Sequence, residues 1–158
     1  MEENLDPQFE TAHTNWMEKQ RKSARGERRR RLSLPKGGNY AELQFLARIW
    51  WPAFGQFDNL HPEYEVRDFK DGYRYLDFAL LLGGLHICIE IDPYGTHKRD
   101  IDRWKYNDNL IRHDHLVLDD WRILRFSLDH IQRHPRLCQQ LLQQAIGKWG
   151  MAPSTPLR

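Results

Sequence analysis

Residues 73–92, YRYLDFALLLGGLHICIEID, decide the fold of this chain. Two runs rich in aromatic and branched apolar residues, 73–81 and 85–91, flank the pair Gly83-Gly84. Such runs favour β-strands, and two glycines between them are a typical hairpin signal. The stretch therefore predicts two antiparallel strands joined by a tight turn.

The sequence on both sides of this hairpin predicts further strands and helices. Before it we expect a helix that begins at Asn39 and that Pro52 and Gly55 end, and then a strand over residues 61–69. After it we expect a helix over 99–112, a strand over 121–126 and a last helix with Pro135 in its first turn. This order predicts an α/β fold in which helices flank a mixed β-sheet.

The N-terminal segment carries its own helix signal. Asp6-Pro7 is typical of an N-cap followed by proline at the first helical position, and Phe9, Ala12 and Trp16 recur at helical spacing. We therefore expect a helix over about 8–30. The break Pro35-Lys36-Gly37-Gly38 then suggests three parts: an arm over 1–38, a domain over 39–150 and a loose tail over 151–158.

The basic residues are concentrated in that arm. Residues 18–36 hold nine Lys or Arg and two Glu, whereas the net charge of the whole chain is only +2. A block such as Arg28, Arg29, Arg30 and Arg31 suits a polyanion, most often nucleic acid. The alternative is a solvated, partly disordered tail.

Composition excludes several other classes of protein. No apolar run approaches the ~20 residues that span a bilayer, so we expect no membrane partner. The polar start MEENLDPQFE does not resemble a secretory signal. Cys88 and Cys138 form no CxxC pair, and Cys88 falls in an expected core strand, which fits a reducing cytoplasm.

Carboxylates gather around the predicted hairpin. Side chains alternate along a strand, so Glu90 and Asp92 share one face of the second strand. Asp77 lies between Leu76 and Phe78 and is expected to point away from both. A turn at Gly83-Gly84 sets Asp77 nearly opposite Glu90, and like charges facing each other destabilise a sheet.

A divalent cation would remove that repulsion. Magnesium prefers carboxylate, carbonyl and water oxygens, so the pattern predicts a Mg²⁺ site, with Mn²⁺ as an alternative metal. The competing interpretation is that these acids form ion pairs with Arg74, Arg103 or Arg125. No Cys or His set has zinc spacing, and His113 and His115 are expected in a loop at a helix end.

Two further residues are candidates for the same site. His97, in the turn YGTH, has a side chain that exchanges protons near neutral pH and could accept one from a nearby water, although it could equally be an ordinary loop histidine. Glu42 lies in the first turn of the helix that begins at Asn39, where a capping box is an equally good interpretation.

These residues together resemble a known family. Glu42, Asp77 in YLDF, EID followed by YGTH, Arg103 in the next helix and the strand WRILRFS resemble an uncharacterised endonuclease-like group of the PD-(D/E)XK superfamily. That group is related to the very-short-patch repair endonucleases, and the resemblance covers about residues 39–146. It implies a restriction-endonuclease-like core and magnesium-dependent hydrolysis of phosphodiester bonds.

The resemblance also implies roles for single residues. Asp77 and Glu90 would bind the metal, and His97 would be the acid or base. Glu42 would be an auxiliary acid, and Arg103 would contact the phosphate or hold Glu90. Asp92 stands where the superfamily has lysine, and Pro93 stands where the group commonly has glycine. Proline fixes φ and removes an N–H, so both departures bear on activity.

The sequence therefore predicts a metal-dependent endonuclease, with DNA as its partner. A first alternative is a binding module with the same fold and no catalytic activity. A second alternative is a protein-interaction adaptor, whose Phe9 and Trp16 stripe packs on a partner helix.

Overall fold

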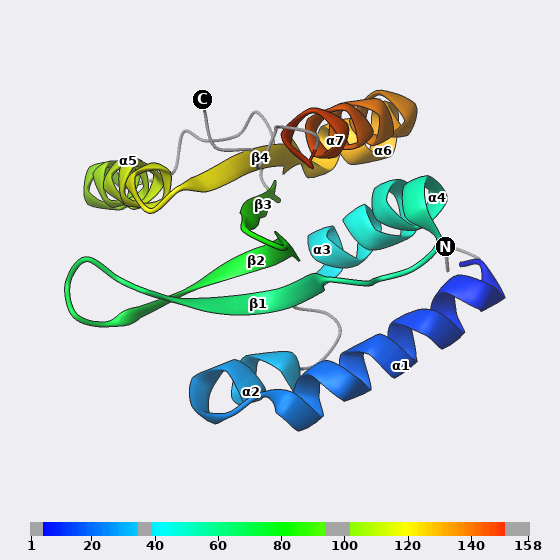
Figure 1. Ribbon diagram of the computed structural model, residues 1–158, viewed down its shortest axis with the longest axis horizontal. Coiled ribbons are helices and arrows are strands. Elements are labelled where there is room, and N and C mark those ends of the chain that lie inside the picture. The colour runs from blue at the N-terminus through cyan, green and yellow to red at the C-terminus, as the bar shows by residue number, and fades with distance from the viewer. Residues whose placement is uncertain (1–4, 35–38, 94–101, 151–158) are drawn as a thin grey trace, which may run out of the picture.

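The computed structural model describes residues 5–34, 39–93 and 102–150. Its centre is one four-stranded sheet in the order β1-β2-β3-β4 (Figure 1). The strands are β1 (Leu60–Arg67), β2 (Tyr73–Leu82), β3 (Leu85–Asp92) and β4 (Trp121–Ser127). β1, β2 and β3 are antiparallel neighbours, and β4 is parallel to β3. The predicted mixed sheet is confirmed, and so is the hairpin, because Leu82 pairs with Leu85 around Gly83-Gly84.

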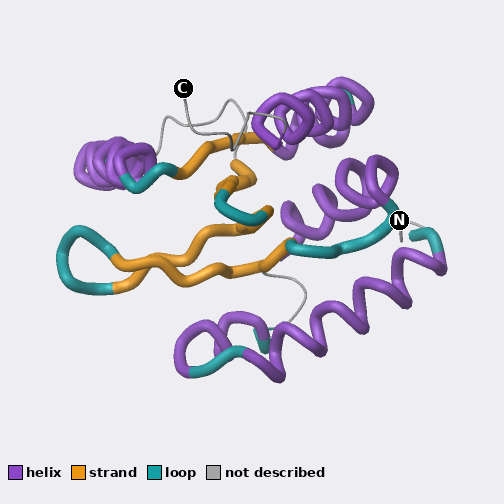
Figure 2. The backbone as a smooth tube through the Cα atoms, viewed as in Figure 1, coloured by secondary structure: helices purple, strands orange, loops and turns teal. Residues whose placement is uncertain are grey.

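Helices lie around this sheet (Figure 2). α5 (Arg103–Leu118) is the crossover between the parallel strands β3 and β4. The helix over residues 40–54 has three parts, which are α3 (Tyr40–Phe45), the π-helical turn η2 (Leu46–Trp50) and α4 (Trp51–Phe54). The remaining helices are α1 (Pro7–Ser23), α2 (Gly26–Leu32), α6 (Leu128–Arg133) and α7 (Pro135–Gly150).

The sheet separates two apolar cores. The larger core joins Phe78, Ile87 and Ile89 to helices α1, α3, α6 and α7. The smaller core joins Leu76, Ala79 and Cys88 to Leu116 of α5. Burial in this smaller core raises the pKa of the Cys88 thiol, which fits the inert structural cysteine expected there.

The N-terminal helices cover the outer edge of β1. The indole Nε1 of Trp16 donates to the carbonyl of Leu60 at 2.9 Å, and Arg28 Nη2 donates to the carbonyl of Pro62 at 2.9 Å. These bonds satisfy carbonyls that an edge strand otherwise presents to solvent. Phe9 and Trp16 are 1% and 8% exposed, so residues 5–34 share the core of the domain that begins near residue 39.

Two of the predicted helix boundaries are wrong. The segment 8–30 forms two helices instead of one, because Ala24 is extended (ψ 153°) and Gly26 has a φ of +58°. The helix expected over 99–112 continues to Leu118, which places His113 and His115 within α5 instead of in a loop.

The helix that begins at Asn39 runs past Pro52 and ends at Gly55, one of the two residues expected to end it. Pro52 has no N–H for the carbonyl of Arg48, four residues earlier. Gln139 Nε2 from α7 donates to that carbonyl instead, at 2.8 Å. The helix therefore passes through a π-helical turn and ends at Gly55, whose φ of +65° is left-handed.

Replacement of Trp16 by alanine tests whether α1 belongs to the core. The variant Trp16→Ala is expected to lose about 3–5 kcal/mol of unfolding free energy, because it leaves a cavity and removes the indole hydrogen bond to the Leu60 carbonyl. Urea denaturation measures this loss. The control Trp104→Ala removes a side chain that is 66% exposed and should change stability by about 0.5 kcal/mol or less. Equal stabilities for the two variants would show that α1 does not pack as described.

Candidate functional site

The β1–β2 ribbon changes face at Asp77. Residues 76 and 78 should share a face of a regular strand, yet Leu76 packs in the smaller core and Phe78 in the larger one. The facing position in β1 is Glu63, between the pairs Pro62–Phe78 and Tyr64–Leu76. Glu63 has a φ of +48°, which is rare for a residue with a side chain. The expectation that Asp77 points away from two neighbours on one face is therefore wrong, because these neighbours face opposite cores.

The backbone pairing of β2 with β3 ends at the same point. Its last pair is Phe78 with Ile89, and beyond it the side chains of Asp77 and Glu90 bond to the opposite backbone. The Ile91 N–H donates to Asp77 Oδ2 at 2.8 Å, and the Asp77 N–H donates to Glu90 Oε2 at 3.2 Å. The predicted juxtaposition of Asp77 and Glu90 across the hairpin is thus present.

A guanidinium from α5 contacts one of these two carboxylates. Arg112 Nη2 donates to Glu90 Oε1 at 2.9 Å and to the carbonyl of Tyr75 at 3.0 Å. Arg74, one of the partners suggested from sequence, bonds instead to Asp68 and Asp108. Arg103 and Arg125 are exposed, and Arg125 is the register partner of Glu90 on β4. An ion pair is therefore present at Glu90, with an arginine other than the three suggested from the sequence.

Two more carboxylates lie against Asp77. Glu42 comes from the first turn of α3, where Asn39 makes no side-chain capping bond. Burial and the negative charge of Asp77 raise the pKa of Glu42 to about 7. The same two causes raise the pKa of Glu63, although the Arg31 guanidinium opposes this rise. Burial and the carboxylate of Glu90 raise the pKa of Asp77 to about 8.

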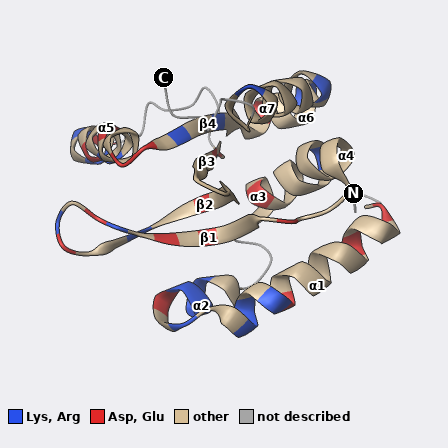
Figure 3. Ribbon diagram, in the orientation of Figure 1, with Lys and Arg blue, Asp and Glu red and all other residues tan. Residues whose placement is uncertain are grey.

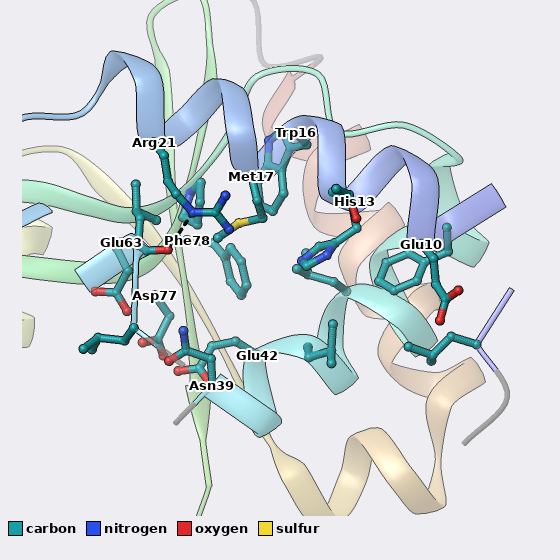
Figure 4. A pocket seen from close by; sticks show the side chains of 18 residues that line it. Glu10, His13, Trp16, Met17, Arg21, Asn39, Glu42, Glu63, Asp77 and Phe78 are labelled. Carbon is teal, nitrogen blue, oxygen red and sulfur yellow. Dashed lines mark hydrogen bonds between the residues drawn. The ribbon is translucent and has the colours of Figure 1, made fainter. Parts of the chain in front are cut away.

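These acids line one end of a cavity of about 410 Å³ between α1 and α3 (Figure 4). Glu42, Glu63 and Asp77 lie together at that end, beside Asn39 and below Arg21 of α1. Farther along, the walls are mostly apolar and include Trp16, Met17, Leu43 and Phe78. We call this cavity the α1–α3 chamber.

The arginines of the basic run point in different directions. Arg28 is half-buried and donates to the carbonyls of Pro62 and Glu63 and to Gln20. Arg31 lies over the ring of Tyr75 at 4.3 Å and near Glu63. Arg29 and Arg30 are exposed, and Arg30 pairs with Glu27. Arg28 is thus engaged inside the protein, whereas Arg29 and Arg30 are exposed. Lys and Arg gather on α2 and on the adjoining end of α1 (Figure 3).

The sequence predicts three other residues for this site, namely Asp92, His97 and Arg103. Asp92 is half-buried at the end of β3, opposite Ser127. His97 and the neighbouring Lys98 lie outside the described residues. Arg103 begins α5 and is exposed to solvent. The structure therefore brings together Asp77, Glu90 and Glu42 from the predicted set.

The donor atoms at this site suit a hard cation. Every candidate ligand is a carboxylate oxygen, which Mg²⁺ prefers, and burial together with a neighbouring carboxylate raises the pKa values of Glu42 and Asp77. Within residues 5–34, 39–93 and 102–150, no three His, Cys, Asp or Glu side chains are arranged to hold a metal ion. Mg²⁺ commonly uses only one or two carboxylates and keeps several waters, so Asp77 and Glu90 remain a suitable pair.

Two residues of the site were missed from the sequence. The sequence predicts Glu63 only as an ordinary strand residue, because its positive φ depends on the β1–β2 pairing. Arg112 was placed at the end of a shorter helix, where its contact with Glu90 could not be foreseen. Its signal is the spacing Asp108, Arg112 and Leu116, which sets all three on the inner face of α5.

Comparisons with known proteins give no family assignment. No protein-family model, no curated protein and no solved structure matches the chain. The resemblance to the PD-(D/E)XK superfamily therefore rests on the quoted residues alone. Among the helices described, none combines the length and the apolar character needed to cross a bilayer.

The raised pKa values predict that stability falls as pH rises. The folded protein keeps protons on Asp77 and Glu42 up to about pH 7–8, whereas unfolded carboxyls release them near pH 4. Stability should therefore be greatest near pH 4–5 and decrease toward pH 8, by at most about 1.4 kcal/mol per pH unit for each carboxyl. Urea denaturation in EDTA between pH 5 and pH 9 measures this slope.

The variant Asp77→Asn separates this effect from other titrations. Its amide oxygen can still accept the Ile91 N–H, but it carries no charge. The variant should show a flatter pH profile and exceed the parent in stability at pH 8.5. The control Asp114→Asn, on the exposed side of α5, should keep the slope of the parent. An unchanged slope in Asp77→Asn would contradict the assignment.

Proposed function

We propose that this protein is a divalent-metal-dependent nuclease that hydrolyses phosphodiester bonds, with DNA as its substrate. The observation that carries the proposal is the convergence of Asp77 and Glu90 where the β2–β3 pairing ends. Two adjacent strands present carboxylates to each other there, and two further acids lie beside Asp77. A purely structural site would gain nothing from this repulsion.

The proposed roles follow from the contacts of each residue. Asp77 and Glu90 hold Mg²⁺ or Mn²⁺, and Arg112 orients Glu90 through the 2.9 Å bond to Oε1. Glu42, with a pKa near 7, is suited to exchange a proton with water next to the reacting phosphate. The bound metal would supply stabilisation of the charge that develops on the phosphoryl oxygens.

The remaining predicted residues keep narrower roles in this proposal. His97 is retained as a second acid or base, and Asp92 as a carboxylate at the end of β3. Exposed Arg29, Arg30 and Arg103 would contact phosphates without regard to sequence. The restriction-endonuclease-like core is part of the same proposal, supported by the mixed sheet with α5 as the crossover from β3 to β4.

A second candidate function is a nucleic-acid-binding module without catalytic activity. It is favoured by the absence of a three-residue metal group within the described ranges and by the bond of Arg112 to Glu90. The proline at position 93, in place of the family's glycine, points the same way. Metal binding and cleavage distinguish the two functions.

A plasmid-cleavage assay tests the nuclease directly. The parent should cut DNA with Mg²⁺ or Mn²⁺ and not with EDTA. Asp77→Asn and Glu90→Gln should each lower the rate by at least about 100-fold, which corresponds to about 2.7 kcal/mol in the barrier. Both should still bind DNA. Asp114→Asn serves as the matched control and should cut like the parent. Full activity in Asp77→Asn would exclude this mechanism.

Metal binding should also appear as a gain in thermal stability. A ligand bound only by the folded state raises the melting temperature as its concentration exceeds its Kd. Because protons and Mg²⁺ compete for the carboxylate of Asp77, the gain should be larger at pH 8.5 than at pH 6. Asp77→Asn should lose the gain. A parent with no Mg²⁺-dependent shift at either pH would support the binding module.

A further inference from the structure

The α1–α3 chamber has one charged end and one apolar end. Glu42, Glu63 and Asp77 occupy the first, and Arg21 reaches into the same end from α1 (Figure 4). Its guanidinium is held there because Arg21 Nε donates to the carbonyl of Leu32 at 3.0 Å. A cation bound by the carboxylates and the fixed guanidinium together suit a phosphate between them.

The apolar end has the character of a site for a flat ring. Trp16 of α1 and Phe78 of the sheet line it, together with Met17 of α1 and Leu43 of α3. Aromatic and sulfur-containing side chains accept the face of any nucleobase, and such stacking is tolerant of base identity. The walls are rigid, since Trp16 stacks on Phe57 at 4.7 Å and bonds to the Leu60 carbonyl.

Helices α1 and α2 form the roof of the chamber and exclude a continuous double helix. α1 and α2 are tied to β1 by Trp16, Arg28 and the ring contact of Arg31 with Tyr75. The side chains of Glu63 and Glu90 are only 16% and 15% exposed. A cavity of about 410 Å³ is at the lower end of small-ligand sites, which run from about 300 to 1,000 Å³. The major groove of a duplex alone is about 12 Å wide.

We infer that the α1–α3 chamber binds a single unpaired nucleotide, with the base against Trp16 and Phe78 and the phosphate at the carboxylate end. This inference rests on the proposed nuclease function and names its substrate class. The substrate is nucleic acid that offers an unstacked nucleotide, either single-stranded or unpaired within a duplex. A fully paired duplex must first release a base, which requires unpairing and unstacking.

Two DNA substrates test the inference. One is a fluorescein-labelled duplex with a single unpaired nucleotide, and the other is the same duplex fully paired. Cleavage is followed in Mg²⁺, and binding is followed by anisotropy in Ca²⁺ on DNA shown to remain intact. The parent should favour the unpaired substrate at least about tenfold in both readouts, because the other must spend free energy on extruding a base.

Variants that fill the chamber provide the critical comparison. Met17→Trp on α1 and Leu43→Trp on α3 leave every carboxylate in place and should lower the preference to about onefold. Leu141→Trp adds the same side chain at a 47% exposed position of α7 and should retain the preference. A thermal melt of each variant verifies folding. Because one variant fills the chamber from α1 and the other from α3, the comparison can still be made if one of them does not fold.

The outcomes separate this inference from the nuclease itself. Equal cleavage of both substrates, or a preference that both filling variants retain, overturns the inferred nucleotide site. The proposed nuclease activity is not contradicted by either result. If neither substrate is cut, the nuclease fails and the binding ratio decides the chamber. A binding preference that the filling variants abolish then supports it, and equal binding of the two substrates overturns it.

Discussion

The arrangement of the site depends on the end of backbone pairing between β2 and β3. Up to Phe78 and Ile89 the two strands form a regular ladder, and at the next position carboxylate oxygens accept the backbone N–H groups. These side-chain hydrogen bonds satisfy both backbone N–H groups and bring two acids together in a site with little solvent. Burial and the repulsion between these acids raise the pKa of Asp77, and the cation that we propose would relieve this repulsion.

The second constraint is the cover over the outer edge of β1. An open strand edge invites pairing with other chains, and here α1 and α2 occupy it with Trp16, Gln20 and Arg28. The same helices form the roof of the α1–α3 chamber. Arg28 and Arg31 therefore stabilise the fold at Glu63, although the composition of their segment indicates a nucleic-acid contact.

These two features connect stability with the proposed activity. Buried acids with raised pKa values destabilise the folded protein at neutral pH, and a well-packed core must offset that effect. The aromatic contacts of Phe9, Trp16 and Phe57 in the larger core contribute to this offset. A cation at the carboxylate end would offset the repulsion, so we expect metal binding to stabilise the folded protein.

Local patterns in the sequence were sufficient for the elements near the hairpin. Runs of aromatic and branched apolar residues around Gly83-Gly84 identify β2 and β3, and the equal spacing of Asp77 and Glu90 from the turn sets them side by side. The start of α1 followed equally from Asp6 and Pro7. The order of the later strand and helices also followed, because each is bounded by its own turn or proline.

Tertiary structure alone decided the rest. The positive φ of Glu63 arises where the paired strands β1 and β2 change face together, so no local sequence pattern predicts it. Arg112 reaches Glu90 only because α5 packs on the sheet as the crossover from β3 to β4. The helix passes Pro52 because Gln139, ninety-one residues after Arg48, donates to the Arg48 carbonyl. Sequence patterns report the preferences of neighbouring residues. The ligand-sized chamber and the partners of its charges depend on contacts between residues far apart in the chain.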